Sequence, residues 1–342
     1  MPRMAFACAW PGVLSTAATF AQAPPGYDLD FVTVGAPGNR ATIPGEVPAM
    51  PWLEIGAVDH RYRIMRTHVS VAQYLEFVNA YAPFWQGDPL NPDLFGFWGQ
   101  PVQGPGGKWT YVPRLGSSDF AARVRWDMAA RYCNWLHNGK ANVAAAFESG
   151  VYDSSTFKHG PGWWSHQVEP SEGALFWMPS LDEFTKAAYY DPDRYGLGQE
   201  GYWQYPDASD EPLTKGLPRQ GGETIGDLLG ERNPNFGLGA WPLGMYPHVQ
   251  SPWGLIDVSA TVRDYTSTTG QLYGYASVAG GGSMSGHPIY AYDDRIDMNP
   301  GEPIIASWGG IRLASVVPSP SLVVFALIAS GMTLSRTRRR SQ

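Results

Sequence analysis

The spacing of hydrophobic residues along the chain predicts three amphipathic helices. In the first, four apolar residues fall on one helical face at positions i, i+3, i+4 and i+7: Tyr74, Phe77, Val78 and Tyr81. Ser70 and Gln73 precede this stripe with the spacing of a capping box, in which each side chain satisfies the other's backbone N–H. A helix is therefore expected to begin directly after Ser70.

The second helix is predicted from about Asp127 to Asn138. Ala130, Cys133 and Leu136 recur with a helical period and are expected to face the core. Gly139 follows at once and is the expected C-terminal cap, because glycine readily adopts the left-handed conformation that ends many helices.

The third helix is expected after Pro179, where Ser180 and Glu183 repeat the capping-box spacing. Its apolar side carries Phe184, Ala187 and Ala188. Asp182 and Glu183 also read as an acid pair of the kind used in catalysis. The capping box accounts for Glu183 without catalysis, and we favour that interpretation.

Strand signals are short, and most of the remaining chain is punctuated by glycine and proline, which indicates loops. Four segments are predicted as strands: Phe31 to Val34, Tyr62 to Met65, Trp109 to Val112, and Gly310 to Ala314. With no fixed-period repeat and no low-complexity linker, the sequence predicts one large, loop-rich α+β domain from Tyr27 to Ser315, although its length would permit two domains.

Composition narrows the class of protein. The chain has 44% hydrophobic residues, enough for a buried core, and a formal net charge of −7. No basic stripe is present to neutralise phosphates, so a nucleic-acid partner is not expected. Of the two cysteines, Cys8 lies near the start and Cys133 in the second predicted helix, so no disulfide is expected in the domain.

The first 23 residues have the organisation of a secretory signal peptide. Arg3 is followed by an apolar stretch from Met4 to Phe20 and by the small-x-small site Ala21-Gln22-Ala23. A lipoprotein leader ending at Cys8 is disfavoured because too little hydrophobic sequence precedes that cysteine. Residues 1–23 are therefore predicted to direct export.

Residues 317–342 form a distinctive tail. Val317-Pro318-Ser319-Pro320 precedes a dense apolar stretch, Leu322 to Leu334, which is shorter than the ~20 residues that span a bilayer comfortably. Four arginines follow: Arg336, Arg338, Arg339 and Arg340. The tail resembles the PEP-CTERM sorting signal, with serine in place of its glutamate. That resemblance implies an exosortase-type partner and a short hydrophobic transmembrane helix, and an ordinary membrane anchor is the alternative.

Several segments of the domain resemble the sulfatase-modifying-factor, or formylglycine-generating-enzyme, family. In chain order they are IGAVDHRY (55–62), VSVAQYLEFVNA (69–80), ARYCNWLHNG (130–139), FWMPSLDEFTKAAYYDP (176–192), SPWGLID (251–257), GGS (281–283) and GIRLA (310–314). The resemblance covers nearly the whole domain and implies that family's C-type-lectin-like fold.

The family's oxidases hold copper(I) through two cysteine thiolates that lie shortly after the Gly-Gly-Ser segment. Copper(I) is soft and prefers sulfur. Residues 281–290 of this chain contain no cysteine, and only Ser283 matches a pocket residue of the family. Met284 and His287 could bind copper as a thioether and an imidazole, although a structural role in a glycine-rich loop is favoured. Ser283 and His287 are thus the only pocket-equivalent candidates, and copper is not expected.

The resemblance also implies a calcium site at residues 260–265. Thr261 and Asp264 preserve oxygen ligands there, which calcium prefers. Arg263 brings a positive charge to the same segment, and a salt bridge to a neighbouring carboxylate is the slightly favoured alternative. Calcium therefore remains a candidate cofactor.

Other motifs are sparse. The seven histidines lack short metal-ligand spacing, and there is no G-x-S-x-G elbow and no P-loop. Trp163 and Trp164 could form a platform for a carbohydrate or a peptide, although packing is favoured.

The sequence thus predicts an exported cell-envelope protein whose degenerate formylglycine-generating-enzyme-like domain serves as a binding or surface-structural module. Its ligand would be a peptide or a glycan of the envelope. The alternative is an oxidoreductase of the formylglycine-generating type that oxidises protein cysteines through other ligands.

Overall fold

The computed structural model describes residues 24–46, 54–160, 163–224, 241–258, 262, 264–270, 275–279, 298–299 and 309–318. The described residues from Pro24 to Val317 belong to one compact unit. The predicted signal peptide and nearly all of the predicted sorting tail lie outside the described residues. Among the residues that are described, no helix is long and apolar enough to cross a bilayer.

One sheet contains the first and last strands of the domain. Its order is β1-β2-β15-β8, with β1 at Phe31–Val34, β2 at Tyr62–Met65, β15 at Ala314–Ser315 and β8 at Phe176–Trp177. All neighbours are antiparallel, and Phe31 pairs with Met65. The bounds of β1 and β2 are those that the sequence predicts.

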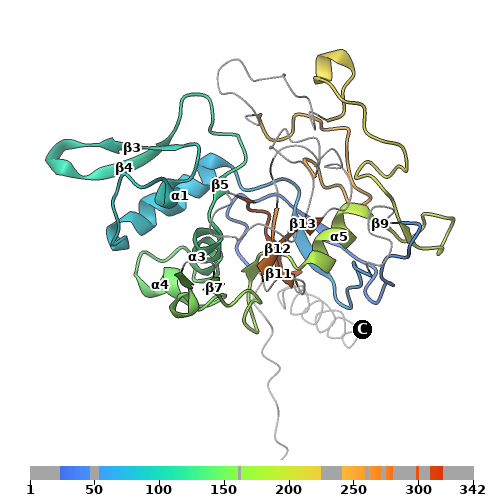
Figure 1. Ribbon diagram of the computed structural model, residues 1–342, viewed down its shortest axis with the longest axis horizontal. Coiled ribbons are helices and arrows are strands. Elements are labelled where there is room, and N and C mark those ends of the chain that lie inside the picture. Colours follow the sequence, from blue (N-terminus) through green and yellow to red (C-terminus); the bar gives the residue numbers. More distant parts are fainter. Residues whose placement is uncertain are drawn as a thin grey trace, which may run out of the picture. The chain divides into compact units, whose positions relative to one another are not determined.

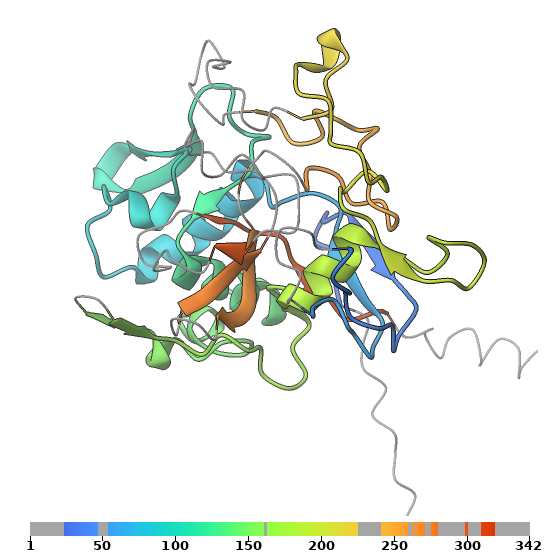
Figure 2. The ribbon, with the colours of Figure 1, turned by 45° about the vertical axis from the view of Figure 1, so that its right-hand side comes forward.

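A second sheet has the order β13-β12-β11-β14-β5. Its strands are β13 at Met298–Asn299, β12 at Tyr275–Ala279, β11 at Asp264–Gly270, β14 at Gly309–Gly310 and β5 at Arg123–Val124. Only the β11–β14 pair is parallel. β11 and β12 contact α5 (Leu181–Tyr189), and the three elements lie close together in Figures 1 and 2.

The prediction of one strand from Gly310 to Ala314 was wrong. β14 and β15 are separate strands that belong to different sheets, and the chain crosses between the sheets at Ile311, Arg312 and Leu313. These three side chains are fully buried. Sequence periodicity cannot distinguish one buried strand from a buried crossover between two sheets.

The three long helices form where the sequence predicts them. α1 spans Val71–Tyr81 and α5 spans Leu181–Tyr189, and both begin with the complete capping box. α3 spans Trp126–His137. Its end is a Schellman motif, because Gly139 has a φ of 72° and the N–H groups of Gly139 and Lys140 donate to Leu136 and Trp135.

Short elements fill the connections. The two-stranded hairpins are β3–β4 (Gly99–Gln103 with Trp109–Pro113), β6–β7 (Lys158–Gly160 with Trp163–Ser165) and β9–β10 (Tyr190–Asp191 with Gly201–Tyr202). The short helices are α2 (Pro92–Phe95) and α4 (Ala145–Glu148), with 3₁₀ turns at Ala82–Phe84, Pro105–Gly107, Ser154–Thr156 and Pro218–Gln220. β4 confirms the predicted strand at Trp109.

Aromatic side chains dominate the core between α1, α3 and α4. Phe77 of α1 is fully buried, and its ring lies within 6 Å of the rings of Tyr132, Trp135 and Phe147. Such rings bury large areas and prefer tilted or edge-on contacts, which suits irregular segments. The observed fold is mixed α+β with small sheets and long loops, as the sequence predicts.

Candidate functional site

The described residues include only part of the sequence-predicted site. Ser283, Met284 and His287 lie outside them, as do Thr261 and Arg263. The backbone of Trp163 and Trp164 forms β7, but their side chains lie outside the described part of the structure. Asp264 and Cys133 are described.

Asp264 is the first residue of β11, and its side chain is completely buried. Its Oδ1 lies 3.0 Å from Nε2 of His68 and 3.5 Å from Nε of Arg312. Both of these side chains are also completely buried. The carboxylate therefore sits in a closed polar cluster, where Arg312 supplies the opposite charge that a buried carboxylate needs.

Arg312 connects three segments of the chain through its guanidinium group. Nη1 donates to the carbonyls of Met65 and Arg66 at 3.1 and 2.7 Å, and Nη2 donates to those of Ile256 and Asp257 at 3.1 Å each. A guanidinium group has five donors in a rigid fork, so it can satisfy several buried carbonyls at once. The crossover between the two sheets is held in place by these bonds.

Both ring nitrogens of His68 face charged neighbours. Its Nδ1 lies 3.4 Å from Nη2 of Arg312. Because a guanidinium group only donates, Nδ1 is the acceptor, and the ring proton is assigned from this network to Nε2, which faces Asp264. His68 also lines an open pocket of about 400 Å³ at the start of α1.

The start of α1 does not offer free donors to that pocket. Ser70 and Gln73 use the capping box, while the N–H groups of Val71 and Ala72 donate to the carbonyls of Phe120 and Ser118. A helix start attracts anions only where such groups are unsatisfied. The pocket consequently lacks the features of an anion site.

Asp257 adds a second carboxylate near this cluster. It is buried, has a φ of 56° and accepts a 2.6 Å hydrogen bond from the N–H of Gly244 at Oδ2. Burial raises the pKa of its carboxyl group, and the Gly244 bond, His68 and Arg312 work in the opposite direction. Asp257 therefore interacts electrostatically with the cluster of Asp264, His68 and Arg312.

The calcium assignment for Asp264 stays a prediction. Arg312 and His68 already neighbour its Oδ1, and a dication would have to share the carboxylate with them. Its Oδ2 has no hydrogen-bond donor among the described residues. Thr261, the other predicted ligand, lies outside them. No group of three or more metal-ligating side chains occurs in the described part of the chain.

Cys133 faces inward, as predicted. Its side chain is fully buried on α3, and burial raises the pKa of its thiol well above the usual range. A thiol of this kind stays protonated, whereas the thiolate is the metal ligand and the nucleophile. Cys133 is therefore a small core residue.

The acid pair at the start of α5 has structural roles. Glu183 accepts hydrogen bonds at Oε2 from Nε1 of Trp177 and from the N–H of Ser180, at 3.0 and 2.7 Å. Its Oε1 lies 3.0 Å from Nε2 of His60. Asp182 accepts a 2.7 Å bond from the N–H of Gly56. The capping interpretation is confirmed, and both carboxylates also attach the 56–60 loop to α5.

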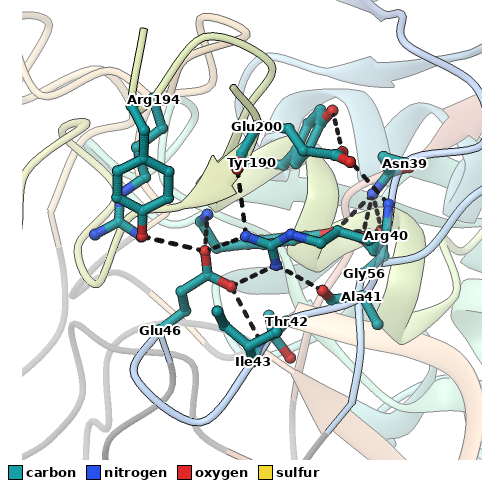
Figure 3. Close-up of polar contacts among 12 residues, drawn as sticks. Asn39, Arg40, Ala41, Thr42, Ile43, Glu46, Gly56, Tyr190, Arg194 and Glu200 are labelled. Atoms are coloured by element: carbon teal, nitrogen blue, oxygen red, sulfur yellow. Dashed lines mark hydrogen bonds and ion pairs between the residues drawn. The ribbon is translucent and has the colours of Figure 1, made fainter. Parts of the chain in front are cut away.

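An ion pair between the half-buried Arg40 and the buried Glu46 was not predicted from the sequence (Figure 3). Nη1 and Nη2 of Arg40 each donate to one oxygen of Glu46 at 2.7 Å, and Glu46 also accepts from the N–H groups of Ile43 and Tyr202. Glu46 is only 2% exposed. Arg40 and Glu46 are only six residues apart in one loop, and it is the bond from the N–H of Tyr202 to Glu46 that joins this loop to β10 across 156 residues of sequence. It stabilises the loops around β9 and β10.

Comparisons with known proteins do not assign the chain to a family. No protein-family model matches it, and no curated protein matches it in sequence. Among solved structures, the crystal structure of CarF is similar over 84% of this chain and 98% of that chain, at 16% identity and a TM-score of 0.43. A match at this level establishes neither a fold nor an activity.

Proposed function

We propose that this protein is a non-oxidase binding or surface-structural module of the cell envelope, built on a formylglycine-generating-enzyme-like, C-type-lectin-like scaffold. In this proposal residues 1–23 direct export, and residues 317–342 serve as the sorting tail that exosortase-type machinery recognises. The ligand is a peptide or a glycan of the envelope.

The proposal rests on the burial of the Cys133 thiol and on its raised pKa. Cys133 is the only cysteine after residue 23, and it is fully buried in the core with a raised thiol pKa. A copper(I) site of two thiolates needs two cysteines that can lose their protons. This chain therefore lacks the ligands through which the family's oxidases bind copper.

The experiment combines metal analysis with an activity assay on the purified full chain. The protein is incubated with copper, oxygen and a cysteine-containing sulfatase peptide, and aldehyde formation is followed by mass spectrometry. We expect no aldehyde and no stoichiometric copper. The variant C133S is the matched control, because an oxidase that used this thiol would lose activity in it.

Aldehyde formation by the wild-type chain would overturn the proposal in favour of an oxidoreductase. Stoichiometric copper that is lost in C133S would overturn it as well. Calcium bound without copper would support the binding module and the ligand role of Asp264.

A further inference from the structure

Three segments meet around Phe97, which follows the short helix α2. The N–H of Phe97 donates to the carbonyl of Arg123 at 3.0 Å, and the N–H of Arg114 donates to the carbonyl of Trp98 at 2.9 Å. These two hydrogen bonds hold the backbones of Arg114 and Arg123 next to Phe97 and Trp98. The second bond also extends the β3–β4 ladder by one residue pair beyond Gly99 and Pro113.

Both arginine side chains lie close to the ring of Phe97. The guanidinium carbons of Arg114 and Arg123 are 6.0 and 5.1 Å from the ring centroid, which is the range of cation–π contacts. Neither side chain forms an ion pair or a hydrogen bond with any other described residue. Two positive charges therefore share one aromatic ring without a neutralising acid in the described part of the chain.

The position of the Arg123 side chain is energetically unfavourable. Its Nε is buried and has no hydrogen-bond acceptor among the described residues, and burial lowers the pKa of its guanidinium group to about 10. A buried donor without an acceptor is energetically unfavourable. Residues 94–118 contain Lys108 and Arg114 but neither aspartate nor glutamate, and Asp93 and Asp119 flank this stretch.

Apolar side chains are exposed next to these charges. Leu115 is 92% exposed and Phe97 is 43% exposed, and Val102 and Val112 are exposed on the hairpin. Val112 and Val102 lie on the same face of the hairpin, because Val112 pairs with Gln100, two residues from Val102. Exposed apolar side chains close to charged groups are typical of an interaction site.

A partner can contact the face of the β3–β4 hairpin that carries Val102 and Val112 more easily than the edges of its strands. The side-chain amide of Asn79 on α1 bonds both the N–H and the carbonyl of Tyr111, each at 2.8 Å, and so occupies the outer edge of β4. Pro101 removes a donor from β3. Figure 1 shows the hairpin beside α1, at the left of the view. Addition of a partner strand is thus disfavoured, and contact must come through side chains.

We propose that Phe97, Arg114, Arg123 and Leu115, with Val102 and Val112, bind an acidic peptide segment of a partner protein that carries carboxylates beside apolar side chains. Its carboxylates neutralise the two arginines, and its apolar residues cover Leu115 and the valines. A loop that inserts into a membrane would carry apolar residues at its tip. The turn of this hairpin, residues 103–108, reads Gln-Gly-Pro-Gly-Gly-Lys instead.

The probe is a fluorescein-labelled peptide of repeating Glu-Gly-Leu units, whose binding to the full chain is measured by fluorescence anisotropy. We expect R114E to weaken binding about tenfold or more, since it replaces attraction with repulsion at the contact. L115S should also weaken it, and added salt should weaken the wild type. R61E and L197S are matched controls at exposed positions elsewhere and should bind like the wild type.

Equal binding by R114E and R61E would overturn the proposal. So would tighter binding of a Lys-Gly-Leu peptide, or binding of phosphatidylglycerol vesicles or inorganic phosphate alone. The proposal rests on the binding role proposed above. The two remain distinguishable, because a chain that ignores the peptide but produces no aldehyde would contradict only the peptide site.

Discussion

His60 is one described residue whose protonation couples pH to the stability of the fold. Its ring is 52% exposed and stands between the carboxylates of Asp59 and Glu183, at 3.1 and 3.0 Å. The hydrogen bond to Glu183 raises the pKa of His60 above its usual value, and burial partly opposes that effect. The folded protein therefore holds this proton more tightly than the unfolded chain does.

The substitution H60Q should remove a pH-dependent part of the stability. Because the folded pKa is raised, the contribution of His60 is fully present below the unfolded pKa of about 6.5 and is lost as the pH rises through the folded value. We expect a difference between wild type and H60Q of less than about 1 kcal/mol at low pH, since water screens the half-exposed ring. Urea unfolding at several pH values measures it.

The matched comparison for H60Q is the pH profile of the wild type. The difference between the two unfolding free energies should shrink as the pH rises. A difference that stays constant across the pH range would contradict the assigned role of the His60–Glu183 contact.

At the scale of elements, single polar side chains join helices to irregular segments. Asn134 of α3 is completely buried, and its amide donates to the carbonyls of Phe147 and Tyr152 at 3.0 and 2.8 Å. Its oxygen accepts from the N–H groups of Val151 and Tyr152, both at 2.8 Å. One side chain thereby satisfies four backbone groups in α4 and in the turn that follows it.

The substitution N134A should destabilise the protein by about 3 kcal/mol or more, because several buried backbone groups lose their partners at once. Chemical denaturation followed by tryptophan fluorescence gives the free energy of unfolding. The control is N142A, at an exposed asparagine close by in sequence, for which a change within about 0.5 kcal/mol is expected. Similar losses in both variants would contradict the role given to Asn134.

The helices themselves were predictable because their signals are local. The capping boxes at Ser70 and Ser180 and the glycine at 139 lie within a few residues of the helix ends that they determine. The strand at Gly310 was mispredicted because its outcome depends on partners more than 40 residues away, such as β2 and β11. Strand pairing is a long-range property that no short window contains.

At the scale of the whole molecule, the Arg312 cluster fastens the two sheets together. Arg312 and His68 are 244 residues apart in sequence, and the guanidinium group also reaches the carbonyls of the 65–66 and 256–257 segments. Loss of this side chain would leave the Asp264 carboxylate buried without its counter-charge. A substitution of Arg312 should therefore lower the stability of the whole unit.

The substitution R312M should cost about 3–5 kcal/mol of unfolding free energy, the usual effect of removing one partner of a buried pair. R312K keeps the charge but not the planar fork, and it should remain clearly destabilised. Denaturation curves for both variants test this. An R312K protein as stable as the wild type would show that the charge alone is needed and that the four carbonyl bonds are not.

The sequence by itself determined the elements whose causes are local: the three long helices with their caps, the inward-facing Cys133 and the general α+β, loop-rich class. The sequence also identified Asp264 as a candidate ligand, but it did not identify the residues that surround this carboxylate. Only the tertiary structure decided that this carboxylate faces Arg312 and His68, that Glu46 accepts a hydrogen bond from the backbone of Tyr202, and that two arginines share the ring of Phe97. The physical reason is that caps and amphipathic stripes act between neighbours in the chain. Buried charges are instead satisfied by whichever groups folding brings within hydrogen-bond distance, across any separation in sequence.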